Sequence, residues 1–458
     1  MRERILVSIV AMALGSRALA QPAAPTPPTD PASIVAFWTA AGDPALARLV
    51  DEALRANPDV RGAESRVVAA RADRRTAMFE LAPIVTTTGG ITRSRPSDAL
   101  VPPALGVRRD QTLFDAGFGA SWEVDVFGRL RPLVAARTAA ADAAVEDVRA
   151  TRVSLAAEVA RAYYERQGVA RQLEVARRNA ENQRHTLQLT VDRLDAGRGT
   201  ALDRERAAAQ LSATLAGVPT LEARAAAATY RLGVLLGRDE TAAPLAPSVI
   251  DAPNDAPALP DLPPLDALPA LVASRPDVRA ADRVLAARGA LVRSARADYL
   301  PRLGIAGSVG LASATADAFG RSGTSRYAIG PVVSWPAFDV GRVRARVDAA
   351  RAEQEDARAS YDRAVLAARA ETRSAYAAAA GARARLAHLH DAARASERGA
   401  ELARLRFEGG AAGFLEVLDA ERTLLEAQDR LAQGETEAAT AFAALYEALA
   451  GAWPAAAR

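Results

Sequence analysis

Two stretches of this chain share one layout. In the first, Ser121-Trp122 precedes Gly128-Arg129-Leu130-Arg131, and in the second, Ser334-Trp335 precedes Gly341-Arg342-Val343-Arg344 at the same spacing. Two further pairs of segments match in the same order: Asn57-Pro58-Asp59-Val60-Arg61 with Arg275-Pro276-Asp277-Val278-Arg279, and Arg193 to Gly197 with Arg406 to Gly410. Ordered self-similarity at a nearly constant offset indicates internal repetition. We therefore predict that the chain consists of two copies of one structural unit.

The two copies are expected to share an internal plan of a helix, a β-hairpin and a long helical hairpin. We assign residues 21–242 to the first copy and 270–458 to the second, joined by a Pro-rich link at 243–269. Pro clusters between periodic segments mark such links. The β-hairpins are predicted at about 83–122 and 301–336, and the helical hairpins at about 129–237 and 341–450.

The hairpin prediction rests on alternation. Apolar residues recur at even spacing, with Phe114, Phe118 and Trp122 in the first copy and Ile305 and Val309 in the second. Such alternation, bounded by turn-rich segments, predicts β-hairpins. At about ten residues, the strands have the length that an outer-membrane barrel uses. A soluble β-hairpin on a helical body fits the same periodicity, and both interpretations remain open at this point.

Long helices are predicted on either side of two Gly clusters. Residues 133–218 and 337–453 contain no Pro, and each tract is interrupted once, by Gly197 and Gly199 or by the cluster that begins at Gly409. Before the first interruption, apolar residues keep a heptad-like spacing: Val148, Leu155, Val159, Ala162, Leu173, Ala176, Ala180, Leu187, Val191 and Leu194. This spacing is typical of a coiled-coil seam. A helix that runs from Leu130 to Leu194 would be about 95 Å long, which a small globular domain cannot use.

The composition excludes several classes of function. The chain of 458 residues has no Cys, which removes disulfide scaffolds, thiol nucleophiles and Cys-ligated metals. Its 58 basic residues, all of them Arg, nearly balance 55 acidic residues and form no block of like charge, whereas a nucleic-acid binder normally shows a basic face. The only His residues are His185, His388 and His390, and no phosphate-binding Gly loop is present. We therefore expect no catalytic residues, no metal, no cofactor and no nucleic-acid partner.

The N-terminus has the layout of an export signal. Arg2 and Arg4 precede an apolar run from Ile5 to Gly15, and Ala18-Leu19-Ala20 follows. This order predicts a cleavable signal peptide over residues 1–20. Gln21 stands where a lipid-anchored protein would need Cys, so acylation at residue 21 is excluded.

Several motifs, taken in order, resemble those of the outer-membrane factor (TolC-like) family of efflux and type I secretion channels. They are Trp122-Glu123-Val124-Asp125-Val126-Phe127-Gly128-Arg129, Arg275-Pro276-Asp277-Val278-Arg279-Ala280-Ala281, Phe338-Asp339-Val340-Gly341-Arg342, Arg406-Phe407-Glu408-Gly409-Gly410 and Leu418-Asp419-Ala420-Glu421-Arg422. The resemblance is greatest to the branch that serves resistance–nodulation–division drug efflux pumps, and it covers nearly the whole mature chain.

This resemblance implies a mixed α/β membrane protein of the cell outer membrane with a large periplasmic portion. It implies a homotrimer in which each protomer gives four strands to a 12-stranded β-barrel and four long helices to a coiled-coil periplasmic tunnel. The implied function is passive conduction of substrates, including drugs, from an inner-membrane pump and a periplasmic adaptor (membrane fusion) protein to the exterior. Outer-membrane lipid would surround the barrel. A component of type I protein secretion and a soluble periplasmic coiled-coil adaptor or scaffold are the alternatives.

The resemblance also implies a gate at the periplasmic aperture, where the tips of the helical hairpins converge. By motif, Leu415 would form an apolar ring and Asp419 a carboxylate ring. Arg406 and Arg422 match positions that pair with carboxylates and hold the closed state. Phe407 occupies a position where family members commonly carry Tyr, so one hydroxyl donor near the gate is missing.

Three more residues complete the predicted sites. Asp203, in the first copy, is the carboxylate that best suits the gate network. Asp419 and Arg422 also have i,i+3 spacing, so an ordinary helix-surface ion pair is the alternative for them. Trp122 and Trp335, at equivalent strand ends, are predicted to be membrane-interface aromatics. Plain packing between strand and helix is the alternative for both Trp residues.

Overall fold

The computed structural model describes residues 29–95, 97, 110–238, 259–451 and 453. The predicted signal peptide and most of the predicted link at 243–269 lie outside these residues. The first half forms α1 (Pro31–Ala40), α2 (Pro44–Ala56), α3 (Pro58–Phe79), β1 (Ile84–Ser94), β2 (Gln111–Val124), α4 (Leu130–Asp195) and α5 (Ala201–Leu235). The second half forms η2 (Leu265–Ala267), α7 (Leu268–Ala273), α8 (Pro276–Ala297), β3 (Arg302–Ser313), β4 (Ser325–Ser334), α9 (Val340–Glu408) and α10 (Phe414–Ala448). From α3 and from α8 onward, the order of elements is the same.

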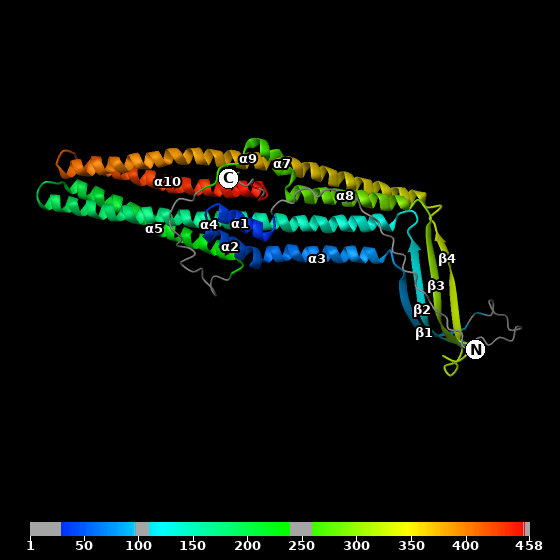
Figure 1. Ribbon diagram of the computed structural model, residues 1–458. Coiled ribbons are helices and arrows are strands. Elements are labelled where there is room, and N and C mark those ends of the chain that lie inside the picture. The colour runs from blue at the N-terminus through cyan, green and yellow to red at the C-terminus, as the bar shows by residue number, and fades with distance from the viewer. Residues whose placement is uncertain (1–28, 96, 98–109, 239–258, 452, 454–458) are drawn as a thin grey trace.

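The molecule is a long helical body with a sheet at one end. The sheet joins the ends of α3, α4, α8 and α9, while the turns α4–α5 and α9–α10 lie together at the opposite end (Figure 1). We call this opposite end the helix tips. With 66 residues in α4 and 69 in α9, each long helix extends about 100 Å. No helix within the described residues is long and apolar enough to cross a membrane.

Each long helix is matched by two shorter helices laid end to end. α4 packs against α3 and α5, and α9 packs against α8 and α10. Asn57 and Arg275, directly before α3 and α8, join the shorter helices to one another. Asn57 Nδ2 donates to the Leu235 carbonyl at 2.9 Å, and Arg275 Nη1 donates to the Ala448 carbonyl at 3.0 Å. The two halves therefore close their helix pairs at the same place.

The largest hydrophobic core lies midway along the rods, where α1 and α2 cover α4 and α10. Trp38 is fully buried there, and its ring centroid lies 4.9 Å from that of Tyr446 and 5.9 Å from that of Phe442. Aromatic side chains bury large areas and prefer such tilted or edge contacts. This core therefore anchors the middle of the molecule, well away from the tips and the sheet.

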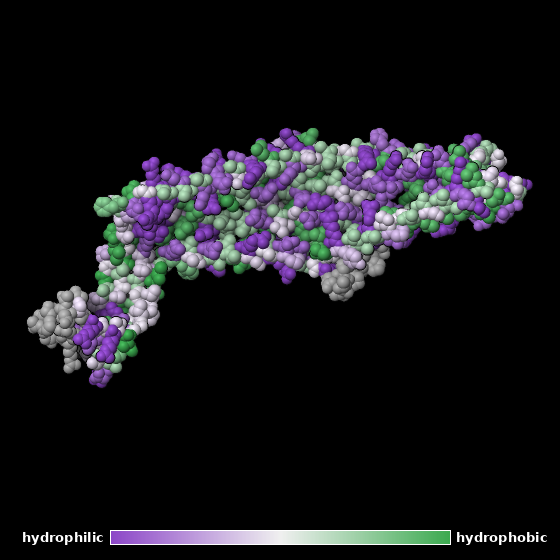
Figure 2. Space-filling view, turned by 180° about the vertical axis from the view of Figure 1, so that it is seen from behind, coloured by the Kyte–Doolittle hydropathy of each residue, from purple (hydrophilic) through white to green (hydrophobic). Residues whose placement is uncertain are grey.

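The sheet is antiparallel, with the order β1-β2-β3-β4 and two distinct faces. Because side chains alternate along strands, the pairing register assigns each residue to a face. The apolar face carries Val85, Ile91, Phe114, Phe118, Trp122, Ile305, Val309, Tyr327, Ile329 and Val333. The polar face carries mostly small or polar residues, among them Thr86, Thr88, Asp115, Gly117, Gly119, Ser121, Ser308, Gly310 and Arg326. Figure 2 shows hydrophilic residues over the helical rods and at the far end of the sheet, with paler and hydrophobic residues between them.

Pro331 lies within β4, opposite Ile305 of β3. A Pro cannot donate a hydrogen bond to a neighbouring strand, and for this reason it is confined mainly to edge strands. β4 is an outer strand of this four-stranded sheet, which explains why Pro331 is tolerated within it.

Candidate functional site

The two helix tips are built by the same backbone motif. Gly197 and Gly410 follow the ends of α4 and α9 with φ of 69° and 74°, a left-handed conformation that favours Gly. The amide of Arg198 donates to the Arg193 carbonyl, and that of Ala411 donates to the Arg406 carbonyl, both at 2.8 Å. These bonds satisfy helix carbonyls that would otherwise lack partners. The Gly clusters thus reverse the chain in both copies by one mechanism.

A single Arg side chain joins the two tips of one chain. Arg193, near the end of α4, donates from Nη2 to the Phe407 carbonyl at 2.9 Å. Its guanidinium carbon also lies 3.7 Å from the centroid of the Phe407 ring, in cation–π geometry. Phe407 is buried and packs against Phe414 and Val417 in a small apolar cluster. The Phe407 side chain therefore faces the contact between the tips.

A buried carboxylate joins three helices close to the tips. The Glu421 side chain, on α10, is only 4% exposed. Its Oε1 accepts from Arg404 Nε of α9 at 2.9 Å and from Thr186 Oγ1 of α4 at 3.1 Å. Its Oε2 is buried without a hydrogen-bond partner among the described residues. Removal of Arg404 would leave a buried charge unpaired, which is strongly destabilising.

The predicted gate residues of the second tip lie on an exposed surface. Arg422 Nη2 donates to Asp419 Oδ1 at 2.8 Å, with the two side chains 60% and 66% exposed. Arg406 Nη1 lies 3.6 Å from Glu416 Oε2. Leu415 is 61% exposed. The structure thus pairs both predicted Arg residues with carboxylates and leaves Leu415 available to a neighbouring molecule.

Asp203 lies at the start of α5 in the first tip. Asp203 Oδ2 accepts from Thr200 Oγ1 at 2.7 Å, and the Asp203 amide donates to Thr200 Oγ1 at 3.2 Å. Thr200 is the N-cap of α5, so this arrangement satisfies an amide that the helix leaves unpaired. Contact between Asp203 and the Arg residues of the second tip stays a prediction.

A polar seam, which the sequence reasoning missed, joins α4 to α10. Arg171 Nη1 lies 3.0 Å from Glu435 Oε2, and its side chain is 9% exposed. Further bonds follow toward the tips: Gln172 to Asp429 at 2.8 Å, Asn179 to Gln428 at 3.1 Å and Thr186 to Glu421 at 3.1 Å. Gln172, Asn179 and Thr186 on α4 recur every seven residues, as at the buried positions of a coiled coil. On α10, the partner residues Glu435, Gln428 and Glu421 recur at the same interval. This seam is the interface between the two helical hairpins of the chain.

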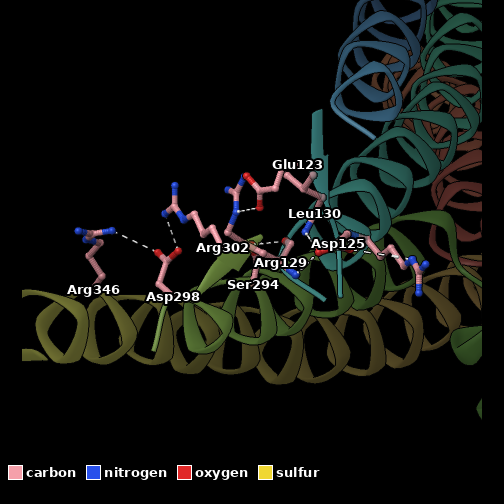
Figure 3. A network of polar contacts seen from close by, with 9 residues as sticks. Glu123, Asp125, Arg129, Leu130, Ser294, Asp298, Arg302 and Arg346 are labelled. Carbon is pink, nitrogen blue, oxygen red and sulfur yellow. Dashed lines mark hydrogen bonds and ion pairs between the residues drawn. The ribbon is translucent and has the colours of Figure 1, made fainter. Parts of the chain in front are cut away.

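A second polar network joins the sheet to the rods (Figure 3). Asp125, just after β2, accepts from the backbone amides of Arg129, Leu130 and Arg131 at 2.6, 3.0 and 2.8 Å. Burial would raise the pKa of Asp125, but the backbone hydrogen bonds and nearby Arg131 outweigh it and hold this pKa below its usual value. The carboxylate therefore caps α4 in its charged form.

The same network extends to the second copy. Arg129 binds both carboxylate oxygens of Glu123 at 2.7 Å, and its carbonyl accepts from Ser294 Oγ of α8 at 2.7 Å. Asp298 accepts from Arg302 at 2.7 Å and from Arg346 of α9 at 3.2 Å (Figure 3). Polar contacts therefore fix the sheet to α4, α8 and α9 where the strands leave the rods.

Trp122 and Trp335 make equivalent contacts at this end. Trp122 Nε1 donates to the Leu81 carbonyl at 2.9 Å, and Trp335 Nε1 donates to the Tyr299 carbonyl at 3.0 Å. Their side chains remain 37% and 57% exposed. Each Trp therefore ties its strand to the turn after the preceding helix, and its position at a membrane interface stays a prediction.

Comparison with known proteins gives consistent matches along the chain. Residues 49–238 and 267–451 match the family described as outer membrane efflux protein. In Pseudomonas aeruginosa, the outer membrane protein OprJ is 31% identical over 415 residues, which cover 90% of this chain and 85% of OprJ. The pyoverdine export outer membrane protein OpmQ of the same organism is 30% identical over 432 residues, which cover 93% of this chain and 89% of OpmQ.

The fold is also similar to that of a solved channel. The structure of the outer-membrane channel OprN aligns with a TM-score of 0.82 and 36% sequence identity, covering 91% of this chain and 92% of OprN. The two ranges matched by the family each contain a helix, two strands, a long helix and a returning helix. Sequence and structure therefore point to the same group of proteins.

Proposed function

This chain belongs to the outer membrane efflux protein family, and from this premise we propose that it acts as a homotrimer whose periplasmic opening is closed by its own helix tips. The chain is the outer-membrane channel of a tripartite efflux system, and its role is transport. The comparisons favour this function over the type I secretion component and the periplasmic scaffold that the sequence left open. A periplasmic adaptor and an inner-membrane pump are therefore its partners.

The sheet supports the trimer proposal. β1 and β4 are the outer strands of the described sheet, and its apolar face is exposed, with Tyr327 85% and Ile329 77% accessible. In a bilayer, unpaired backbone groups at an open sheet edge are costly, so edges must find partners. Three sheets joined edge to edge would pair β1 of one copy with β4 of the next. The result is a closed barrel of twelve strands, with its apolar face toward lipid and its polar face toward the bore.

The exposure of the Asp419–Arg422 pair carries the gate proposal. These side chains lie at the tip farthest from the sheet and are more than half exposed, although they already form an ion pair. Around a threefold axis, three Asp419 carboxylates would repel one another and attract cations, while the adjacent Arg422 side chains would hold them together. Leu415, on the same tip, would narrow the opening with an apolar ring. Arg406, through its ion pair with Glu416, would hold the turn between α9 and α10 that places Leu415 and Asp419 at the opening.

Phe407 and Asp203 would stabilise the helix tips that carry this gate. Phe407 lies behind it, held by Arg193, so it would couple the second tip to the first. Asp203 caps the returning helix of the first tip, where a neighbouring copy could bring an Arg close to it. In this proposal, opening requires the tips to separate while the polar seam between α4 and α10 keeps each chain intact.

Single-channel conductance in planar bilayers tests the gate. We expect Asp419→Ala and Arg422→Ala to raise the conductance severalfold, because each removes an ion pair that holds the aperture closed. Arg430→Ala is the matched control, since Arg430 forms an exposed ion pair with Glu426 farther along the same helix. If neither tip variant changes the conductance relative to this control, the gate lies elsewhere.

Two further measurements test the assembly and its position. The mass of the detergent-solubilised protein should correspond to three chains, and a monomer would contradict the trimer. Brominated lipids should quench part of the Trp fluorescence of the wild type, and Trp122→Phe and Trp335→Phe should each reduce the quenched part, with Trp38 and Trp453 as the common background. Absence of quenching at both positions would mean that these residues serve only to pack strand against helix.

A further inference from the structure

The polar face of the sheet is crowded where β2 and β3 pair. A Cβ atom added at Gly117 would lie 2.6 Å from the Val309 carbonyl oxygen and 2.9 Å from the Cα of Gly310, which pairs with it across β2 and β3. At the base of the sheet, a cavity of about 510 Å³ is lined by polar-face residues that include Glu123 and Arg302. On the apolar face, a Cβ atom at Gly89 would meet its nearest neighbour at 3.8 Å, and one at Gly307 at 3.3 Å.

An ion pair crosses this polar face near the far end of the sheet. Asp115 of β2 and Arg326 of β4 bind each other through Asp115 Oδ1 and Arg326 Nη2, although β3 lies between their strands. Arg326 stands opposite Gly310 in the register, and Gly310 stands opposite Gly117. Because neither Gly has a side chain, the guanidinium reaches across β3 without obstruction. The side chains remain 25% and 45% exposed, so both still face the space in front of the sheet.

The other charges on this face lie at the opposite end of the strands. Glu123 pairs with Arg129, and Arg302 pairs with Asp298, both next to the rods. Between these charges and the Asp115–Arg326 pair, the polar face of β2 and β3 carries Gly117, Gly119, Ser121, Gly304, Ala306, Ser308 and Gly310. Within the described strands, the Asp115–Arg326 pair is therefore the charged layer of the outer half of this face.

We propose that three Asp115–Arg326 pairs form a charge-compensated collar that sets the charge selectivity of the outer bore. This inference rests on the proposed trimer, which would place one pair from each chain around the lumen. Each pair is internally neutral, so the collar exerts little net field on a passing solute. Loss of one partner would leave three like charges in a confined space, where they act on ions much more strongly than on an open surface.

The reversal potential of channels in an asymmetric KCl gradient at low ionic strength tests the collar. We expect Asp115→Asn to shift the cation-to-anion permeability ratio toward anions by about twofold or more, since three Arg326 charges remain. Arg326→Gln should shift the ratio toward cations by a similar factor. The double variant Asp115→Asn/Arg326→Gln should return to the wild-type ratio, because it restores neutrality without the pair.

Control variants separate charge from folding. Asp115→Glu and Arg326→Lys keep the charges and should keep the wild-type ratio. Asp110→Asn removes a partner of the ion pair with Arg95, which lies beyond the strands and is more exposed, and should shift the ratio less. The collar alone would be overturned if the wild-type protein conducts and the single-charge variants also conduct but do not change the reversal potential. It would also be overturned if both single-charge variants shift the reversal potential in the same direction. A wild-type protein that forms no ion-conducting channel would overturn the proposed function, and the collar with it.

Discussion

α4 and α9 occupy the same position in the two halves of the chain, yet their surroundings differ. α4 contacts α3, α5, α8 and α10, and its buried residues include Tyr163, Tyr164 and the polar residues of the seam. α9 contacts α7, α8 and α10, and its buried residues are mostly Ala, with much of its surface exposed. The two halves therefore contain rods of nearly equal length, of which α4 lies in the interior of the chain and α9 on its flank. The same kind of substitution should therefore change stability by different amounts in the two rods, and in one case with opposite sign.

The largest contrast is expected for ion pairs. Arg171→Met in α4 removes the partner of Glu435, whose side chain is 10% exposed, and should lower the free energy of unfolding by about 3–5 kcal/mol. Arg385→Met in α9 removes the partner of Glu437, which is 52% exposed, and should lower it by at most about 1 kcal/mol. Urea unfolding of the detergent-solubilised proteins measures both changes. Equal effects would show that the α4–α10 seam is hydrated in solution.

Glycine substitutions should give opposite signs in the two rods. A Cβ atom at Gly168 in α4 would lie 1.9 Å from Thr436 Oγ1 and 2.9 Å from Thr436 Cβ, so Gly168→Ala would force α4 and α10 apart. We expect a loss of about 1–3 kcal/mol in the free energy of unfolding. Gly381 in α9 has open space around its Cα. Because Ala favours a helix over Gly, Gly381→Ala should add up to about 1 kcal/mol. A destabilising Gly381→Ala, measured in the same way, would mean that another chain covers this part of α9.

The smallest contrast concerns the starts of the two rods. Asp125→Asn should cost about 1 kcal/mol at pH 7, since the charged carboxylate caps α4 through three amides. Asp339, the N-cap of α9, makes no side-chain cap hydrogen bond, so Asp339→Asn should have a smaller effect.

The effect of Asp125 should also depend on pH. Folding lowers the pKa of Asp125, so its contribution is present above the pKa of the unfolded chain, about 4, and is lost as the pH falls through the folded value. The difference in unfolding free energy between wild type and Asp125→Asn should therefore shrink below about pH 4. A difference that stays constant down to pH 2 would contradict this role for the carboxylate.

Much of the architecture could be predicted because it depends on local patterns. The alternation of apolar residues predicted the strands, and the Gly clusters predicted the turns at the helix tips. The position after a helix end is often left-handed, and this conformation strongly favours Gly. The family and the channel function followed from motifs in a fixed order, and the comparisons confirm both. The difference between α4 and α9 could not be predicted, because both tracts have similar composition and burial is decided by which helices pack on them.

Contacts among the candidate site residues could be predicted only where the partners are close in sequence. Asp419 and Arg422 are one helical turn apart, so their pairing follows from spacing. Arg193 and Phe407 meet across the two tips, and Glu421 meets Thr186 across two hairpins. Such contacts depend on the register of antiparallel helices, which the sequence does not state. The heptad recurrence of Gln172, Asn179 and Thr186 is the feature of the sequence that indicates this seam.

The Trp contacts affect how the sheet can move relative to the helical rods. Each indole holds a carbonyl in the turn that follows the helix before its strand, so the sheet is pinned to α3 and α8 at two separate points. Two such contacts restrict rotation of the sheet relative to α3 and α8. We therefore expect displacement of the tips to be taken up mainly by bending or sliding of the rods. The exterior end of the conduit would stand still while its inner end widens.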